Sequence, residues 1–181
     1  ARDLGVRIPH PPALMMTATV RSLVRSLALR PHPEGGFYRE AWRSHGRIPR
    51  NALPRGYGGA RRFATSILFL LPAGSVSRWH RVRSDETWYY HLGGPLELVE
   101  LARGGGWRRT VLGPFPARGH LFQHTVRGGT WFAARPRRGA AFTLAGCAVA
   151  PGFEFADFEL GDARRLAAAR PRHAARIRTF A

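Results

Sequence analysis

Cysteine and long apolar runs are both scarce in this chain. The single cysteine, Cys147, allows no intramolecular disulfide and indicates a reducing, cytoplasmic setting. No uninterrupted apolar run approaches the roughly 20 residues that cross a bilayer as a helix. These absences exclude a disulfide-stabilised scaffold and a helical membrane-spanning protein, so we expect no membrane partner.

Lysine is absent and acidic residues are few. All 29 basic residues are arginines, and they face 11 acidic residues, which gives a formal net charge of +18. Such a balance is typical of proteins that bind nucleic acid. The arginines are scattered from Arg2 to Arg178, however, whereas a groove-binding protein concentrates them on one element. We therefore expect a solvated basic surface without a nucleic-acid partner, and keep an arginine-rich nucleic-acid binder as an alternative.

The length and composition are those of one folded domain. The chain has 181 residues, of which 44% are hydrophobic, so it can bury a core without a metal or a disulfide. We expect one domain over residues 16–170. A proline-rich leader or upstream extension would precede it over residues 1–15, and a loose basic tail would follow over residues 171–181.

Helical spacing occurs only near the two ends of this domain. Val20, Leu23, Val24 and Leu27 follow the i, i+3, i+4, i+7 pattern of a short amphipathic helix. Asp162 is placed to cap a second short helix that ends before the proline at position 171.

Between these helices, short apolar segments alternate with glycine or proline. Strands of this kind about every ten residues, with no helix between them, are typical of an antiparallel sandwich or barrel. The segment 44–62 is rich in glycine, proline and arginine, and we expect a surface loop beside the barrel mouth. The expected strands cover residues 37–43, 64–71, 76–82, 87–92, 96–101, 110–112, 121–126, 130–134 and 140–149.

One stretch carries the most specific motif. It reads Gly74, five residues, His80, five residues, Glu86, six residues and Gly93. This resembles the first motif of the cupin superfamily, which has Gly, five residues, His-x-His, three or four residues, Glu, six residues and Gly. Val82 stands where that motif has its second histidine.

Five blocks in the same order resemble one cupin branch, long described as a domain of unknown function. The resemblance covers roughly residues 20–170 and implies a mainly β fold, an antiparallel cupin β-barrel (jelly roll) with short N- and C-terminal helices. It also implies a homodimer in which N-terminal strands pair with the partner's sheet. The blocks are HPEGGFYRE (32–40), LLPAGSVSRWH (70–80), SDETWYYH (84–91), GTW (129–131) and GCAVAPGFEFADFEL (146–160).

Strand alternation predicts which of these side chains share the barrel interior. His80 and Val82 lie on one face of their strand, and Glu86, Trp88 and Tyr90 on one face of the next. If Glu86 faces His80 inside the barrel, Trp88 and Tyr90 line the same cavity. Such an apolar, aromatic pocket with two titratable groups fits a small-molecule ligand.

The resemblance also implies a ligand set for metal. In metal-binding cupins a second motif adds another histidine, and Phe132 stands at that position here. With two of four ligands missing, we expect no metal cofactor; a divalent metal, if bound, would be held by His80 and Glu86. A metal-dependent oxygenase or lyase is the alternative function.

The leading hypothesis is a barrel that binds a small polar, cyclic, sugar-like or nucleobase-like ligand, with isomerase- or epimerase-type proton transfer. His80 would act as the base, Tyr90 as the proton donor, and Glu86 would orient His80. Several ligand-binding candidates also have a structural interpretation: Glu34 as part of a turn, Trp131 and Phe153 as core aromatics, and Gln123 as a side chain that ties down a neighbouring strand. The ligand-binding candidates are Glu34, Arg39, Trp88, Gln123, Trp131 and Phe153.

Overall fold

The computed structural model describes residues 20–102 and 104–181. The leader expected over residues 1–15 lies outside this part of the chain. The expected strands between residues 37 and 149 are all present, with ends displaced by a few residues at most. The elements are α1 (Val20–Ser26), β1 (Arg30–Pro31), β2 (Phe37–Arg43), β3 (Arg47–Ile48), η2 (Arg50–Ala52), β4 (Arg61–Arg62), β5 (Thr65–Pro72), β6 (Ser77–Val82), β7 (Asp85–Gly93), β8 (Leu96–Leu101), β9 (Trp107–Leu112), η3 (Pro116–Arg118), β10 (Gln123–Val126), β11 (Trp131–Pro136), β12 (Phe142–Ala150), η4 (Phe155–Asp157), β13 (Phe158–Leu160), α2 (Ala163–Ala169), η5 (Pro171–His173) and α3 (Ala174–Arg178).

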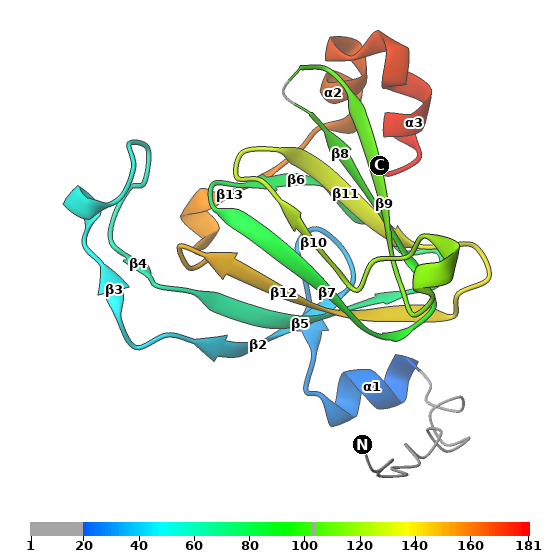
Figure 1. The fold of residues 1–181 in the computed structure, drawn as a ribbon, viewed down its shortest axis with the longest axis horizontal. Coiled ribbons are helices and arrows are strands. Elements are labelled where there is room, and N and C mark those ends of the chain that lie inside the picture. Colours follow the sequence, from blue (N-terminus) through cyan, green and yellow to red (C-terminus); the bar gives the residue numbers. More distant parts are fainter. Residues whose placement is uncertain (1–19, 103) are drawn as a thin grey trace, which may run out of the picture.

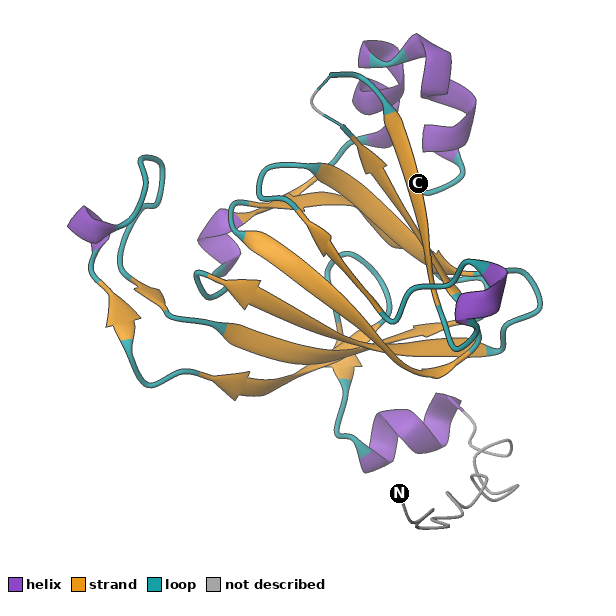
Figure 2. Cartoon of the chain, in the orientation of Figure 1, coloured by secondary structure: helices purple, strands orange, loops and turns teal. Residues whose placement is uncertain are grey.

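Two antiparallel sheets face each other and form the barrel (Figures 1 and 2). The larger sheet has the strand order β1-β2-β5-β12-β7-β10, and the smaller has the order β13-β6-β11-β8-β9. Most neighbours in these sheets, such as β5 and β12, are far apart in sequence, so long-range pairing closes the barrel.

The middle of the barrel is filled by side chains from both sheets. Phe69, Trp88 and Phe132 are almost fully buried, and their rings pack edge to face. Small barrels are filled in this way because their interior has room for side chains only. Any ligand space must therefore lie at an end of the barrel.

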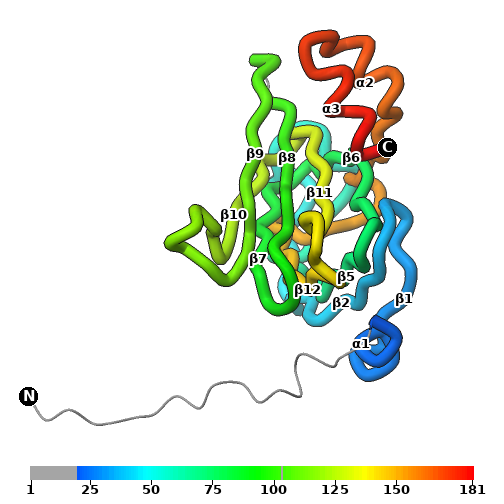
Figure 3. The backbone as a smooth tube through the Cα atoms, turned by 90° about the vertical axis from the view of Figure 1, so that its right-hand side faces the viewer, coloured from blue at the N-terminus to red at the C-terminus, as the bar shows by residue number. Residues whose placement is uncertain are grey.

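Helices cover the outer face of each sheet (Figure 3). The apolar side of α1 packs against Leu70 and Leu144 of the larger sheet, as its spacing predicts. On the smaller sheet, α2 and α3 pack over Trp79 and Val99. Asp162 caps α2, because its side chain accepts hydrogen bonds from the backbone of the first turn. None of the described helices has the length and apolar character needed to cross a membrane.

The expected loose tail over residues 171–181 is wrong. This segment forms η5 and α3, and Ile177 and Phe180 are buried against the smaller sheet. Trp79 donates its indole hydrogen to the Ile177 carbonyl oxygen over 2.9 Å. Ile177 lies in α3 and Phe180 lies two residues beyond its end, so the helix is too short to show an apolar period among its arginines.

The segment 44–62 projects from the barrel as an arm (Figure 1), and it contains the short antiparallel pair β3–β4 as well as loop. Its returning end is fixed to the barrel by buried polar contacts. The Tyr57 hydroxyl lies 2.9 Å from the Ser84 hydroxyl, and the Arg61 guanidinium donates two hydrogen bonds to the Asp157 carboxylate. The arm is therefore anchored beside the segment that forms η4 and β13.

Candidate functional site

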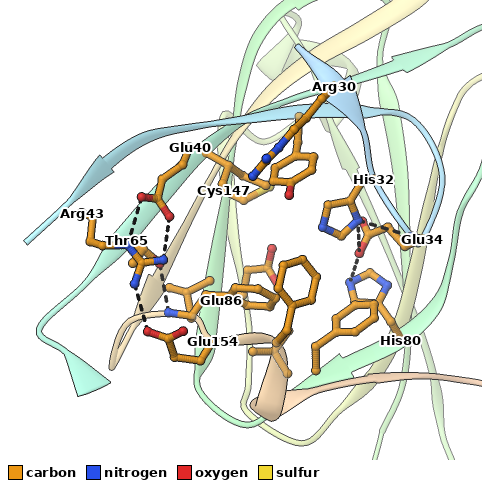
Figure 4. Close-up of a pocket in the computed structure, with 17 residues that line it drawn as sticks. Arg30, His32, Glu34, Glu40, Arg43, Thr65, His80, Glu86, Cys147 and Glu154 are labelled. Atoms are coloured by element: carbon orange, nitrogen blue, oxygen red, sulfur yellow. Dashed lines mark hydrogen bonds and ion pairs between the residues drawn. The ribbon is translucent and has the colours of Figure 1, made fainter. Parts of the chain in front are cut away.

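A pocket of about 130 Å³ opens at one end of the barrel (Figure 4). Titratable side chains occupy its buried part, aromatic rings form one wall, and charged side chains surround its mouth. The buried titratable residues are His32, Glu34, His80 and Glu86. The aromatic wall consists of Tyr38, Phe153, Phe155 and Phe158. The charged residues at the mouth are Arg30, Glu40, Arg43 and Glu154.

A glycine turn before β2 brings Glu34 into this pocket. Gly35 has φ 115°, and a Cβ there would collide with the Val76 carbonyl oxygen, so only glycine allows this approach. The turn is held on β6, because the Arg78 backbone N–H donates to the Glu34 carbonyl oxygen over 2.9 Å. Glu34 is 5% exposed.

His80 points inward from β6 and contacts the Glu34 carboxyl. Its Nδ1 lies 2.7 Å from the Arg78 carbonyl oxygen, and its Nε2 lies 3.2 Å from Glu34 Oε2. A carbonyl oxygen only accepts, so Nδ1 carries the hydrogen and Nε2 of the neutral ring presents a lone pair. Burial lowers the pKa of His80, which favours this neutral form.

His32 presents a second lone pair to the same carboxyl oxygen. Its Nδ1 accepts the backbone N–H of Glu34 over 3.3 Å and lies 3.5 Å from Glu34 Oε2. Burial lowers the pKa of His32 to about 4, and it raises the pKa of Glu34 to about 8 against the opposing hydrogen bond from Ser77. A proton on Oε2 can be donated to His80 Nε2, whereas a carboxylate would be repelled by the lone pairs of both nitrogens. Glu34 is therefore a neutral acid at pH 7.

Glu86 lies at the start of β7 and is also buried. Burial raises the pKa of Glu86 to about 7, and the nearby Glu34 carboxyl also raises it. His80 and a hydrogen bond with the Cys147 thiol lower this pKa and so oppose the shift. Burial also raises the pKa of Cys147 well above its ordinary value, so the thiol stays protonated. Glu86 thus changes charge near neutral pH, as an efficient general base does.

The chain matches one family model, described as Cupin superfamily (DUF985), over residues 21–161. It belongs to this cupin family. Two solved structures are similar along nearly their whole length. A hypothetical protein from Leishmania major is 35% identical, with a TM-score of 0.82 and coverage of 91% of this chain and 99% of that one. A protein from Shewanella oneidensis is 35% identical, with a TM-score of 0.80, and the match covers 91% of this chain and 98% of that one.

More distant cupins share the fold alone. Oxalate decarboxylase from Bacillus subtilis is 13% identical, with a TM-score of 0.50, over 83% of this chain and 37% of that one. None of the curated proteins matches the chain. The fold is thus the expected cupin barrel, while the homodimer and the cytoplasmic setting stay predictions.

The residues of this cupin do not fit the metal-ligand set of metal-binding cupins. Val82 lines the pocket at the second histidine position. Phe132 pairs with His80 across β6 and β11, and its ring centroid lies 4.0 Å from the imidazole. Within residues 20–102 and 104–181, no three His, Cys, Asp or Glu side chains are grouped as metal ligands. The side chains of Val82 and Phe132 thus occupy two of the four metal-ligand positions, and neither has an atom that binds a metal.

Four of the predicted site residues meet at the pocket. His80, Glu86, Glu34 and Phe153 all line it, although they come from β6, β7, the turn before β2 and the segment after β12. The closest partner of His80 Nε2 is the Glu34 carboxyl rather than that of Glu86, which influences the imidazole through its charge. The structure therefore gives Glu34 the position beside His80 that we expected for Glu86.

Trp88 and Tyr90 share the inward face with Glu86 but lie beyond the pocket. Trp88 is part of the filled core, and Tyr90 donates its hydroxyl hydrogen to the Gly93 carbonyl oxygen over 2.5 Å. At about 3.3 Å per residue, Tyr90 is roughly 13 Å along the strand from Glu86. The expected continuous cavity is wrong because aromatic side chains fill the barrel between these positions.

Three further candidates point away from the barrel interior. Arg39 follows the inward Tyr38 and is exposed, and Gln123 pairs with the outward Tyr89. Trp131 packs among the residues under α2 and α3, with the Arg81 guanidinium 4.6 Å from its ring. Alternation along β2, β10 and β11 places all three on outer faces, so none of them lines the pocket in which we expected them to contact a ligand.

The pocket residues that lie in β1 and in the loops were not predicted from the sequence. His32 stands two positions before Glu34, and Phe155 two positions after Phe153, and this spacing is the signal that could have found them. Arg30 and Tyr38 face each other across β1 and β2. A two-residue strand such as β1 has no periodicity from which to predict this pairing.

Proposed function

We propose that this cupin binds a small polar, cyclic ligand and transfers a proton at one of its carbon atoms without a metal, as isomerases and epimerases do. The observation that supports this most strongly is the position of Glu34 Oε2, which faces the lone pairs of two neutral imidazoles. That arrangement holds a proton on a buried acid beside a second carboxyl with a pKa of about 7.

The chemistry divides between the two carboxyls. Glu86, as a carboxylate, takes the proton from a carbon next to a carbonyl group of the ligand. Glu34, as an acid, gives its proton to the carbonyl oxygen, and an enediol or enol results. The carboxylate left on Glu34 faces two lone pairs, so it readily takes a proton back when the carbon is reprotonated. His80 holds Glu34 in this state and does not itself act as the base.

The aromatic wall favours a ring-shaped ligand. Phe155 is 53% exposed although it lines the pocket, and Phe153 and Phe158 pack against it edge to face. An exposed ring at a pocket mouth provides an apolar surface on which the face of a sugar or a planar base can lie. The pocket is smaller than the 300 Å³ or so typical of sites for larger ligands, which limits the ligand to about one ring.

The test combines ligand screening with isotope exchange. Monosaccharides, sugar acids and nucleobases are screened by thermal shift, because a ligand at a hundred times its dissociation constant stabilises by about 2.7 kcal/mol. Ligands that bind are incubated with the protein in D₂O, and the loss of a carbon-bound hydrogen signal is followed by proton NMR. We expect exchange with the wild type and a loss of at least about a hundredfold in Glu86→Gln and Glu34→Gln.

Two results would contradict the proposal. One is exchange that persists unchanged in Glu86→Gln and Glu34→Gln. The other is stoichiometric iron, manganese, nickel or zinc in protein purified without chelator, lost in His80→Ala, which would favour a metal-dependent oxygenase or lyase. Arg25→Gln, on the exposed side of α1, is the control and should exchange at the wild-type rate.

A further inference from the structure

The mouth of the pocket contains two arginines in different electrostatic situations. Arg43 forms ion pairs with Glu40 at 2.7 Å and Glu154 at 2.9 Å, so two carboxylates use its N–H donors. Arg30 forms no ion pair with any described residue, although it acts on Glu40 through its charge. Its guanidinium lies 4.9 Å from the centre of the Tyr38 ring. The mouth therefore has no net charge, but the N–H donors of Arg30 are not used by a carboxylate.

Arg30 is held where its charge acts on the pocket. It is exposed on β1, an edge strand of the larger sheet, and it is among the residues that line the pocket. Its positive charge contributes to the lowered pKa of His32, on the same short segment, and to that of Glu40. The ring of Tyr38 supports the guanidinium without using its N–H donors, which stay free for a ligand.

The buried part of the pocket does not repel an anion. Glu34 is a neutral acid, held so by the two imidazole lone pairs, and both imidazoles are themselves neutral. Of the carboxyls below the mouth, only Glu86 ionises near neutral pH. A negatively charged group of a ligand at the mouth therefore meets the free N–H donors of Arg30, while Glu40 and Glu154 are held by Arg43, and at most one charged carboxyl lies deeper in the pocket.

We propose that the ligand of this pocket is a sugar acid, whose carboxyl group is bound by Arg30 at the mouth while its carbon skeleton extends along Phe155 toward Glu86. A guanidinium fork binds a carboxylate through two parallel hydrogen bonds. A single guanidinium with free donors matches the single charge of a carboxylate better than the nearly double charge of a phosphate. This inference rests on the proposed function and names the ligand class for the same site.

The experiment compares acids with their neutral counterparts. Dissociation constants are measured by calorimetry for D-glucuronate against D-glucose and for D-galacturonate against D-galactose. In the wild type we expect at least one acid to bind about tenfold or more tightly than its neutral counterpart, and Arg30→Gln to remove that difference. The affinity of the acid should fall with added salt in the wild type and much less in Arg30→Gln. Arg25→Gln is the matched control for loss of one exposed arginine and should behave as the wild type.

Several results would overturn the inference: no binding by either acid, equal binding of acid and neutral counterpart, or acid binding unaffected by Arg30→Gln. Failure of the proposed function has a different signature. An acid that binds through Arg30 but shows no carbon–hydrogen exchange supports the ligand class and contradicts the proton transfer. A neutral sugar whose exchange depends on Glu86, with no effect of Arg30→Gln, supports the proton transfer and contradicts the ligand class.

Discussion

At the scale of single residues, the proton on Glu34 is the most consequential feature of this cupin. Its position follows from hydrogen-bond polarity: two nitrogens that can only accept face one carboxyl oxygen, and the Ser77 hydroxyl donates to the other. A glutamine in the same place offers an amide N–H where the acid has its O–H, and keeps a carbonyl oxygen for Ser77. The variant Glu34→Gln therefore removes the ionisable proton of Glu34 but keeps its hydrogen-bond contacts.

We predict that Glu34→Gln is about 2 kcal/mol more stable than the wild type in denaturant at pH 6, because its hydrogen bonds are conserved and it does not hold a proton that the unfolded wild type releases above about pH 4.5. Glu34→Ala leaves Ser77 and the imidazoles without partners and should be about 1–3 kcal/mol less stable than Glu34→Gln. Carbon-13 NMR of the glutamate carboxyl carbons supplies the direct measurement. One resonance should titrate near pH 8 and disappear in Glu34→Gln; a wild-type spectrum in which every glutamate titrates below pH 6 would contradict the assignment.

At the scale of secondary-structure elements, long strands could be predicted from the sequence and short elements could not. The apolar run of β5 and the alternation in β6 and β7 fix both the strands and the inward positions of His80 and Glu86. The pocket, however, is completed by β1, the Glu34 turn and η4, which are two to four residues long or irregular. Their contacts depend on the closed barrel, so local pattern contains no signal for them, and Arg30, His32 and Phe155 were missed.

Local sequence pattern also contains no signal for the short C-terminal helix α3. We expect this helix to stabilise the barrel. Ile177 has no exposed surface and its carbonyl oxygen accepts the Trp79 indole hydrogen, so its side chain is fixed over the smaller sheet. Ile177→Ala should lower the free energy of unfolding by about 2–5 kcal/mol, the usual cost of a cavity in a core. Denaturant titration of this variant beside Arg172→Ala, an exposed position in η5, measures the effect. Equal stability of the two variants would show that α3 contributes little.

At the scale of the whole molecule, the buried pocket groups make stability depend on pH. The pKa of Glu34 is raised to about 8 and that of Glu86 to about 7, so the folded protein holds protons that the unfolded chain has released above about pH 4.5. Each carboxyl thus loses its stabilising contribution as the pH rises toward the folded pKa. The lowered pKa values of His32 and His80 act oppositely and favour folding as the pH rises toward 6.5.

Because these effects oppose each other, the predicted change in the free energy of unfolding is clearest in one pH range. Below pH 6.5 the carboxyls and the histidines partly cancel. Between pH 6.5 and 8 the unfolded histidines lose only their remaining protons and the carboxyls dominate, so the free energy of unfolding should fall by about 2 kcal/mol. Urea titrations at several pH values across this window measure the slope, and Glu34→Gln should reduce it because one of the two groups is gone. Glu159→Gln removes an exposed carboxyl paired with Arg81 and serves as the control that keeps the wild-type slope. If the wild type gained stability from pH 6.5 to 8, both carboxyls would have to be ionised in the folded protein, and the neutral acid on which the proton transfer depends would not exist.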